Sequence, residues 1–236
     1  MDEKAVAPVP PGPASVVFGD ALPLAVEFAE RLAAAGVERG LIGPREVERL
    51  WDRHLLNSAV VAERIDSGAR VVDVGSGAGL PGIPLALARP DLDLTLLEPM
   101  ARRVAWLEEV VGALGLTVRV VRGRAEEPGI KQRRAGADVV IARAVAPLDR
   151  LWGWSAPLLR QGGRLLALKG ESAEAEATRD SAAVSRAGGG TPRVGRCGVG
   201  VLEVPTTIIE VERVGVRPRT GVRGRRQRVS RQDQGH

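Results

Sequence analysis

One stretch of the chain, Arg70 to Ala88 (RVVDVGSGAGLPGIPLALA), constrains the fold more than any other. It begins with a short run of valines, continues with glycines at alternate positions from Gly75 to Gly79, and ends in an apolar segment. A short apolar run before glycines is typical of a buried parallel strand, and glycine lets the backbone turn sharply close to a ligand. A helix that begins just after such a turn directs free N–H groups at an anionic group. The stretch therefore predicts a strand–loop–helix cradle for a nucleotide.

The spacing of these glycines distinguishes between kinds of nucleotide loop. A dinucleotide-binding loop follows G-x-G-x-x-G, but Leu80 stands where the third glycine would be. A P-loop has a lysine after its last glycine, and no lysine follows Gly82. The pattern present is D-x-G-x-G-x-G, from Asp73 to Gly79, and it resembles the first motif of class I methyltransferases, which bind S-adenosylmethionine. A glycine-rich turn in an unrelated α/β domain is the alternative interpretation.

Strand-like and helix-like runs alternate from Arg70 onward, as in a doubly wound α/β fold. We expect helices over 83–88, 101–115 and 147–160 and from Glu171, and parallel strands over 70–74, 92–98, 117–123, 137–144 and 162–170. Residues 188–200 are expected to form a loop, and 199–204 with 206–213 a terminal antiparallel pair. The predicted fold class is a class I S-adenosylmethionine-dependent methyltransferase, Rossmann-like and doubly wound, with a mostly parallel sheet and a terminal antiparallel strand.

Both ends of the chain differ in composition from this methyltransferase domain, which we assign to residues 67–213. Residues 1–17 are rich in proline and alanine, so they are predicted to be disordered. Apolar residues recur at helical spacing within 18–66, which predicts a small N-terminal helical lobe before the sheet. Residues 214–236 are predicted to form a basic disordered tail, because like charges repel one another.

The basic character of the chain is concentrated in this tail. Eight arginines and one acid lie from Arg213 onward, a local charge of +7 against +5 for the whole chain. Such a tail either contacts nucleic acid or only improves solubility, and the composition favours neither interpretation.

Acidic residues in or near the ends of the first three expected strands indicate where a cofactor would bind. Asp73, within the first strand, would face the ammonium of S-adenosylmethionine or serve as a strand-end acid satisfied by loop amides. Glu98 ends the second strand 23 residues after Gly75, a spacing at which a carboxylate accepts the ribose hydroxyls of adenosine. Dehydrogenases share this feature, so Glu98 does not distinguish between cofactors. The Arg124–Glu127 loop would border the adenine or begin a helix with favourably placed acids.

The end of the fourth strand, Ile141–Pro147, is where this class of enzyme places its substrate chemistry. It contains neither N-P-P-Y, which grips an exocyclic amine, nor Pro-Cys, the nucleophile for carbon-5 methylation. A ribose-methylating tetrad needs two lysines, and only Lys169 lies in a fitting place. What remains is a lone pair that is already nucleophilic, such as a purine N7, which needs positioning and electrostatics more than a base. Arg143 is the candidate catalytic residue, pairing with guanine O6 or a phosphate, and a structural arginine at the sheet edge is the alternative.

The motifs between Leu41 and Glu171 resemble, in order, those of the bacterial small-subunit (16S) rRNA guanine-N7 methyltransferases, also called glucose-inhibited division protein B. The matching segments are RHLLNS (Arg53–Ser58), DVGSGAGLPGIPLA (Asp73–Ala86), ARP (Ala88–Pro90), LLEP followed by RR (Leu96–Arg103), GRAEE (Gly123–Glu127), ARA (Ala142–Ala144) and ALKGE (Ala167–Glu171). The chain departs from the family where a W-N-x-x-x-N-L-T element is often found. Asn57 also stands where the family often has aspartate.

This resemblance implies S-adenosyl-L-methionine as cofactor and methyl transfer to N7 of a guanine in small-subunit ribosomal RNA. The ligand contacts implied by the family fall on Gly75, Leu80, Ala125, Glu126 and Arg143. With the positions discussed above, the expected cofactor-binding residues are Asp73, Gly75, Gly77, Gly79, Leu80, Glu98, Ala125, Glu126 and Arg143. The RNA side is expected to include His54, Arg102, Arg103, Arg124 and Lys169. For His54 the resemblance competes with the observation that a lone histidine on a helix is usually structural.

Composition limits the other possible functions. Aromatic residues make up 3% of the chain, fewer than a single-strand binder that stacks bases usually has. The one cysteine, Cys197, allows no internal disulfide and suits the cytosol, and no apolar run approaches the roughly 18 residues of a membrane span. We therefore expect a cytoplasmic monomer, without a metal site or membrane contact, that acts on ribosomal RNA or a ribosomal particle. The alternatives are a non-catalytic RNA- or ribosome-binding module and a small-molecule methyltransferase.

Overall fold

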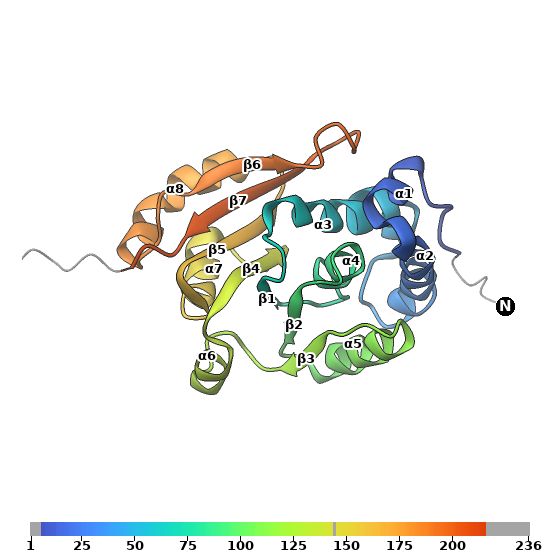
Figure 1. Ribbon diagram of the computed structural model, residues 1–236, viewed down its shortest axis with the longest axis horizontal. Helices are drawn as coiled ribbons and strands as arrows, with labels where there is room; N and C mark the ends of the chain where they lie inside the picture. The colour runs from blue at the N-terminus through green and yellow to red at the C-terminus, as the bar shows by residue number, and fades with distance from the viewer. Residues whose placement is uncertain (1–5, 144, 216–236) are drawn as a thin grey trace, which may run out of the picture.

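The computed structural model describes residues 6–143 and 145–215, which are organised around a central sheet (Figure 1). Its strands are β1 (Arg70–Val74), β2 (Asp93–Glu98), β3 (Arg119–Arg122), β4 (Ala137–Arg143), β5 (Leu159–Lys169), β6 (Arg193–Cys197) and β7 (Thr206–Glu212). Their order across the sheet is β3-β2-β1-β4-β5-β7-β6. Strands β1 to β5 run parallel, whereas β7 runs antiparallel to both β5 and β6. The predicted doubly wound, mostly parallel sheet with a terminal antiparallel strand is therefore confirmed.

Helices cover both faces of this sheet. Neighbouring residues of a strand point to opposite faces, and apolar residues on both faces need to be buried. Val71 and Ile208 belong to the hydrophobic cluster on one face, and Val72 and Ile209 belong to the cluster on the other. The first cluster includes residues of α4 (Gly82–Ala88) and α5 (Ala101–Ala113). The second includes residues of α6 (Pro128–Arg134), α7 (Leu148–Ser155) and α8 (Ala173–Arg186).

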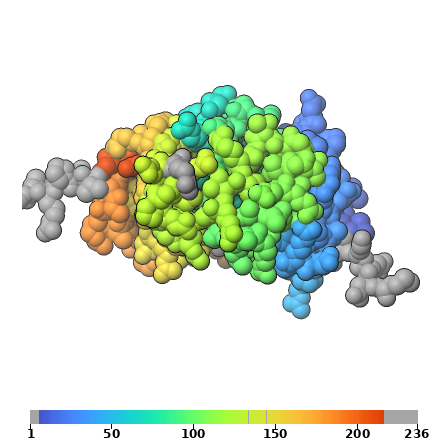
Figure 2. All heavy atoms as spheres, turned by 90° about the horizontal axis from the view of Figure 1, so that it is seen from below, coloured from blue at the N-terminus to red at the C-terminus, as the bar shows by residue number. Residues whose placement is uncertain are grey.

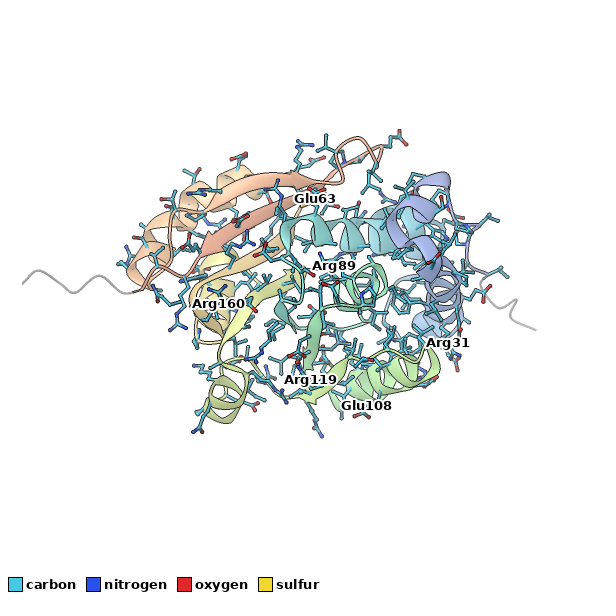
Figure 3. All side chains as sticks on the ribbon, viewed as in Figure 1. Arg31, Glu63, Arg89, Glu108, Arg119 and Arg160 are labelled. Carbon is cyan, nitrogen blue, oxygen red and sulfur yellow. The ribbon has the colours of Figure 1, made fainter. Side chains whose placement is uncertain are left out.

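The predicted N-terminal lobe of helical segments is present, and it packs on the same face of the sheet as α4. Its segments are α1 (Gly12–Phe18), η1 (Gly19–Ala21), α2 (Leu22–Arg31), η2 (Leu32–Gly36), η3 (Pro44–Arg49), η4 (Leu50–Leu56), α3 (Asn57–Ala59) and η5 (Val60–Arg64). Phe28 and Leu50 are fully buried in the cluster of that face. Arg89, labelled in Figure 3, donates hydrogen bonds to the carbonyls of Ala62 and Ile65. The lobe and the sheet thus share one core, and the domain boundary at residue 67 stays a prediction.

The prediction that residues 1–17 are disordered is wrong for the described part of that segment. Helix α1 begins at Gly12 and has Pro13 in its first turn, where the missing N–H of a proline has no intrahelical partner to lose. Ala14 is buried, and the indole Nε1 of Trp51 donates a hydrogen bond to the Pro8 carbonyl at 2.8 Å. Contact with the later segments of the lobe therefore orders a segment whose composition alone suggested disorder.

The predicted position of the terminal strand pair also needs correction. Strand β6 lies at Arg193–Cys197, inside the expected loop, and residues 199–204 form turns and bends. Because β6 is the edge strand of the sheet, it needs no continuous apolar run. Gly198 and Gly200, with φ of 76° and 79°, adopt the left-handed conformation that turns the chain just after the strand.

Helices α1 and α2 of the lobe and helix α8 lie at opposite ends of the molecule, as the blue and orange regions of Figure 2 show, whereas the end of the lobe contacts β6, since Arg64 donates a hydrogen bond to the Arg196 carbonyl. Among the described residues, no helix has both the length and the apolar character needed to cross a membrane. The basic tail predicted over 214–236 lies, from residue 216 onward, outside the described residues.

Candidate functional site

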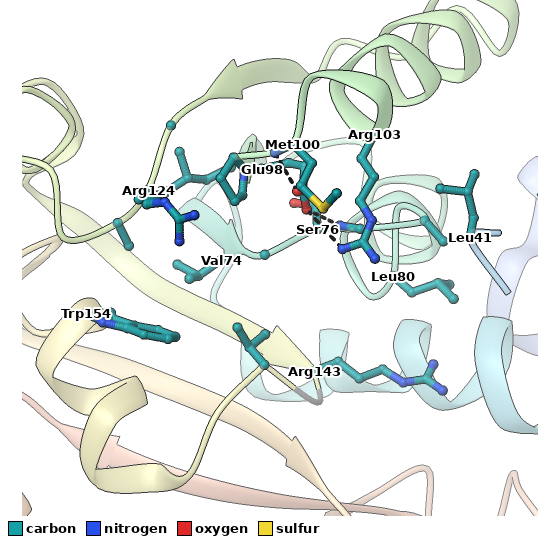
Figure 4. A pocket seen from close by; sticks show the side chains of 18 of the residues that line it. Leu41, Val74, Ser76, Leu80, Glu98, Met100, Arg103, Arg124, Arg143 and Trp154 are labelled. Atoms are coloured by element: carbon teal, nitrogen blue, oxygen red, sulfur yellow. Dashed lines mark hydrogen bonds and ion pairs between the residues drawn. The ribbon is translucent and has the colours of Figure 1, made fainter. Parts of the chain in front are cut away.

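A cavity of about 650 Å³ opens at the carboxyl ends of β1 to β4 (Figure 4). This is the point where the strand order reverses beside β1, and ligands of open α/β sheets bind at such a point. The volume falls within the about 300–1,000 Å³ typical of small-molecule sites. Ten of the predicted site residues line the cavity, namely His54, Gly75, Gly77, Leu80, Glu98, Arg103, Arg124, Ala125, Glu126 and Arg143.

The glycine-rich loop after β1 forms one wall of the cavity, and two of its glycines have separate reasons to be there. Gly77 has a φ of 54°, a conformation that side chains branched at Cβ rarely adopt. Gly82 begins α4, where a Cβ would lie 2.2 Å from Leu96 Cδ2 and 2.7 Å from Asp73 Oδ2. Gly77 therefore shapes the cavity wall, whereas Gly82 allows α4 to pack closely against the sheet.

Glu98, at the end of β2, is a buried carboxylate that holds the loop and also faces the cavity. Its Oε2 accepts a hydrogen bond from the Gly77 N–H and its Oε1 accepts one from the Met100 N–H, each at 2.9 Å. A carboxylate oxygen accepts more than one hydrogen bond, so Glu98 keeps acceptor capacity for the hydroxyls of a ligand. The guanidinium of Arg103 lies 4.0 Å from Oε2 and partly balances the buried charge.

Asp73 and Gly79 lie behind this wall rather than on it. The Asp73 side chain is completely buried, and its Oδ2 accepts a hydrogen bond from the Gly82 N–H at 3.1 Å. Burial, and to a smaller extent the nearby charge of Glu98, raises the pKa of Asp73 to about 7. A Cβ on Gly79 would meet Ile83 Cδ1 at 2.4 Å. Both residues therefore support the packing of α4 beneath the loop.

On the opposite wall, His54 connects Arg143 at the end of β4 to Glu46 in η3. The His54 Nε2 lies 2.7 Å from Glu46 Oε2, and its Nδ1 lies 2.7 Å from the Arg143 guanidinium. Arg143 also donates to the Ser58 hydroxyl at 3.3 Å. Burial and, second to it, the charge of Arg143 lower the pKa of His54 to about 4, so the imidazole is neutral at pH 7. Burial also lowers the pKa of Arg143, to about 10, which leaves its guanidinium charged.

The other predicted RNA-side residues divide between the cavity rim and other environments. Arg103 and Arg124 line the cavity. Arg102 is exposed and is not part of its wall. The Lys169 Nζ donates to Glu176 Oε1 at 2.8 Å and to the Ala146 carbonyl at 2.9 Å, so an internal ion pair already occupies this amine.

Some residues of the wall were not anticipated from the sequence, and Trp154 of α7 is the largest of them. Neighbouring positions of that helix, Leu151, Trp152 and Ser155, are buried, whereas Trp154 is only partly buried. The sequence signal that could have indicated Trp154 was an aromatic residue next to the buried positions of the expected helix. The remaining unanticipated wall residues include Leu41, Ile42, Glu46, Met100 and Val145. Within the described residues, no group of three or more His, Cys, Asp and Glu side chains could hold a metal ion.

Comparison with known sequences identifies one protein family. The sequence profile of the family described as "rRNA small subunit methyltransferase G" matches residues 22–198. Proteins named "Ribosomal RNA small subunit methyltransferase G" are similar over most of the chain. The protein of Mycobacterium sp. (strain KMS) is 57% identical over 94% of this chain and 97% of its own length. That of Rhodococcus jostii (strain RHA1) is 59% identical over 84% and 87%, and that of Salinispora arenicola (strain CNS-205) is 60% identical over 87% and 88%.

Solved structures of similar fold are methyltransferases of low sequence identity. A putative S-adenosyl-L-methionine-dependent methyltransferase from Methanococcus maripaludis aligns with a TM-score of 0.55 and 14% identity, over 77% of this chain and 91% of that one. The M. jannaschii protein TYW2 in complex with AdoMet aligns with a TM-score of 0.52 and 16% identity, over 69% and 76%. At these identities the likeness concerns the fold alone.

Proposed function

Because the chain belongs to the rRNA small subunit methyltransferase G family of S-adenosylmethionine-dependent methyltransferases, we propose that it methylates N7 of a guanine in small-subunit (16S) ribosomal RNA. Because the family consists of methyltransferases, this chain is an enzyme rather than a non-catalytic module. The atom attacked, the RNA substrate and the roles of individual residues belong to the proposal, as do a monomeric state and a cytoplasmic location.

The cavity wall supports binding of S-adenosylmethionine. Glu98 has acceptor capacity for the ribose hydroxyls, and the backbone at Gly75, Gly77 and Leu80 borders the space beside it. Ala125 and Glu126 border the side assigned to the adenine. When bound, S-adenosylmethionine supplies an electrophilic methyl group on a positively charged sulfur.

The observation that carries the choice of N7 is the engagement of His54, the only histidine among the described residues that line the wall. One ring nitrogen is paired with Glu46 and the other with Arg143, so neither is free to remove a proton from a substrate. A purine N7 has a lone pair at neutral pH and loses no proton when it attacks, so a site whose histidine cannot act as a base suits it.

The proposed role of Arg143 is to fix guanine O6 or a neighbouring phosphate by charge-assisted hydrogen bonds. The guanidinium has five N–H donors, and it makes three hydrogen bonds within the described residues. Donors therefore remain for a ligand. Arg103 and Arg124 at the rim are proposed to attract the RNA backbone.

The test uses ribosomal RNA in which the target guanine is replaced by 7-deazaguanine. We expect this RNA to bind with normal affinity and to accept no methyl group, whereas unmodified RNA is methylated. Methylation of the deaza substrate at a normal rate would exclude N7. A methyltransferase for small molecules, the alternative substrate class, would keep its activity at high salt, whereas activity on RNA should fall because phosphate contacts are salt-dependent.

A further inference from the structure

The Glu46–His54–Arg143 cluster joins parts of the molecule that are far apart in sequence. Glu46 lies in η3 and His54 in η4, both within the N-terminal lobe, whereas Arg143 ends β4. His54 and Arg143 are 89 residues apart in sequence, yet His54 Nδ1 lies 2.7 Å from a guanidinium nitrogen of Arg143. All three residues line the cavity. The cluster is therefore a direct polar connection between the lobe and the sheet at the site.

The direction of each hydrogen bond in this cluster follows from the chemistry of its groups. A guanidinium only donates hydrogen bonds, so His54 Nδ1 must accept one from Arg143. A neutral imidazole carries its single proton on the other nitrogen, so His54 Nε2 donates to the Glu46 carboxylate. The imidazole can hold Arg143 only in this tautomer, because an Nδ1–H would point at the guanidinium N–H.

Glu46 is the group that favours this tautomer. Its Oε2 lies 2.7 Å from His54 Nε2 and 3.7 Å from Arg53 Nε. His54 is only 7% exposed, so little water is available to accept the Nε2–H in place of the carboxylate. Arg143 makes no ion pair within 4.0 Å among the described residues, and Glu46 stabilises its charge from beyond the imidazole.

We propose that Glu46 is a positioning residue, which sets the tautomer of His54 and thereby holds the Arg143 guanidinium toward the substrate. The effect on turnover rests on the proposed function, whereas the effect on the imidazole does not. Without the carboxylate, the Nδ1–H tautomer becomes populated and Arg143 loses its closest partner. Arg143 then samples other side-chain rotamers, and turnover falls although the residue itself is still present.

The variants separate hydrogen bonding from charge and from general damage to the helix. Glu46→Ala removes the acceptor, whereas Glu46→Gln removes the charge and keeps an amide oxygen that can accept from Nε2–H. The Glu46 side chain is 32% exposed, so its truncation leaves no enclosed void. Glu48→Ala is the matched control, because Glu48 is exposed and lies in the same η3 segment. This substitution removes the same charge as Glu46→Ala. Circular dichroism of each variant checks that it is folded.

The first measurement is the ¹⁵N NMR spectrum of the histidine side chains in the full-length protein. The chain has two histidines, His54 and His236, so the assignment is simple and the second signal is an internal reference. We expect wild-type protein, Glu46→Gln and Glu48→Ala to show His54 protonated at Nε2. Glu46→Ala should show averaging between tautomers. An unchanged His54 spectrum in Glu46→Ala would overturn the proposal.

The second measurement is methyl transfer to ribosomal RNA, analysed as kcat and as KM for each substrate. We expect Glu46→Ala to lower kcat about tenfold, the factor that corresponds to about 1.4 kcal/mol, with an unchanged Kd for S-adenosylhomocysteine. Glu46→Gln should recover most of this loss, and Glu48→Ala should match wild type. Equal kcat in Glu46→Ala and Glu48→Ala, or equal losses in Glu46→Ala and Glu46→Gln, would refute the positioning role. If wild-type protein methylates no ribosomal RNA, the proposed function fails, and the NMR comparison still decides whether Glu46 sets the imidazole.

Discussion

Replacing Asp73 by asparagine should change how the stability of the protein depends on pH. The carboxyl group is fully buried, its Oδ2 accepts one N–H from Gly82, and its Oδ1 has no hydrogen-bond partner among the described residues. Burial, supported by the charge of Glu98, raises the pKa of Asp73 from 3.8 to about 7. The folded protein therefore holds this proton over a pH range in which the unfolded chain has already released it.

The sign and size of the effect follow from this difference in pKa. Because the folded state has the higher pKa, the stability that the proton provides is complete below pH 3.8 and is lost as the pH rises to about 7. Each pH unit in this window corresponds to about 1.36 kcal/mol, so the total loss is about 4 kcal/mol. Asparagine does not titrate, and every other titratable group is common to wild type and variant.

The assay is urea unfolding of wild type and Asp73→Asn at pH values from about 4 to about 8. The difference between their free energies of unfolding, wild type minus variant, should fall by about 4 kcal/mol up to pH 7 and then level off. Asp138→Asn is the control, because the hydrogen bond from Arg160 lowers the pKa of Asp138, and its difference should stay flat above about pH 5. A difference for Asp73→Asn that is constant, or that rises with pH, would refute the assignment of a protonated carboxyl.

Three further changes test the cavity wall and the tail. Gly77→Val forces a β-branched residue into a φ of 54° and should abolish S-adenosylhomocysteine binding measured by calorimetry. Gly77→Ala, whose Cβ would meet no atom closer than the Gly75 carbonyl oxygen at 3.7 Å, should retain more affinity, and normal binding by the folded valine variant would contradict the role of the loop. Glu98→Gln deprives one of two backbone N–H groups of its acceptor and should weaken the same binding by about 1.5–3 kcal/mol, whereas an unchanged Kd would remove Glu98 from the cofactor site. Truncation after Val214 should lower RNA affinity and flatten its salt dependence without changing cofactor affinity, and an identical salt slope would leave only the solubility interpretation of the tail.

The central strands could be predicted from the sequence because both of their faces are buried. The expected first strand, 70–74, coincides with β1, and the expected second strand, 92–98, begins one residue before β2. Segments whose order depends on one partner were harder to predict. Strand β6 pairs with β7 alone, and α1 is ordered by contact with the other segments of the lobe, so local composition was misleading for both. The expected helix over 147–160 also extended past Ser155, where α7 ends. Leu158 and Leu159 are buried and apolar, and such residues suit the end of a helix as well as the start of β5.

Spacing alone predicted the site only where one segment contains the whole signal, whereas the family resemblance indicated wall residues such as His54, Ala125 and Glu126. The glycine loop and Glu98 occur at fixed distances within a single β-α-β unit, so their spacing indicated a cofactor site. The surroundings of a polar side chain depend instead on which distant segment packs beside it. Lys169 has an ordinary sequence context, yet Glu176 and the Ala146 carbonyl occupy its amine. No spacing rule relates Arg143 to His54, because their contact arises only when the lobe packs on the sheet.

The neutral imidazole beside Arg143 has a consequence that a carboxylate in its place would not have. A direct carboxylate partner would neutralise the guanidinium and engage two of its N–H groups in a bidentate pair. His54 instead accepts one hydrogen bond and leaves the positive charge uncompensated at the cavity, where Figure 4 shows Arg143 on a different wall from Glu98. Desolvation makes such a charge unfavourable, and Glu46 reduces this cost from beyond the ring. This arrangement keeps Arg143 charged, oriented and supplied with free donors, as recognition of a guanine oxygen or a phosphate requires.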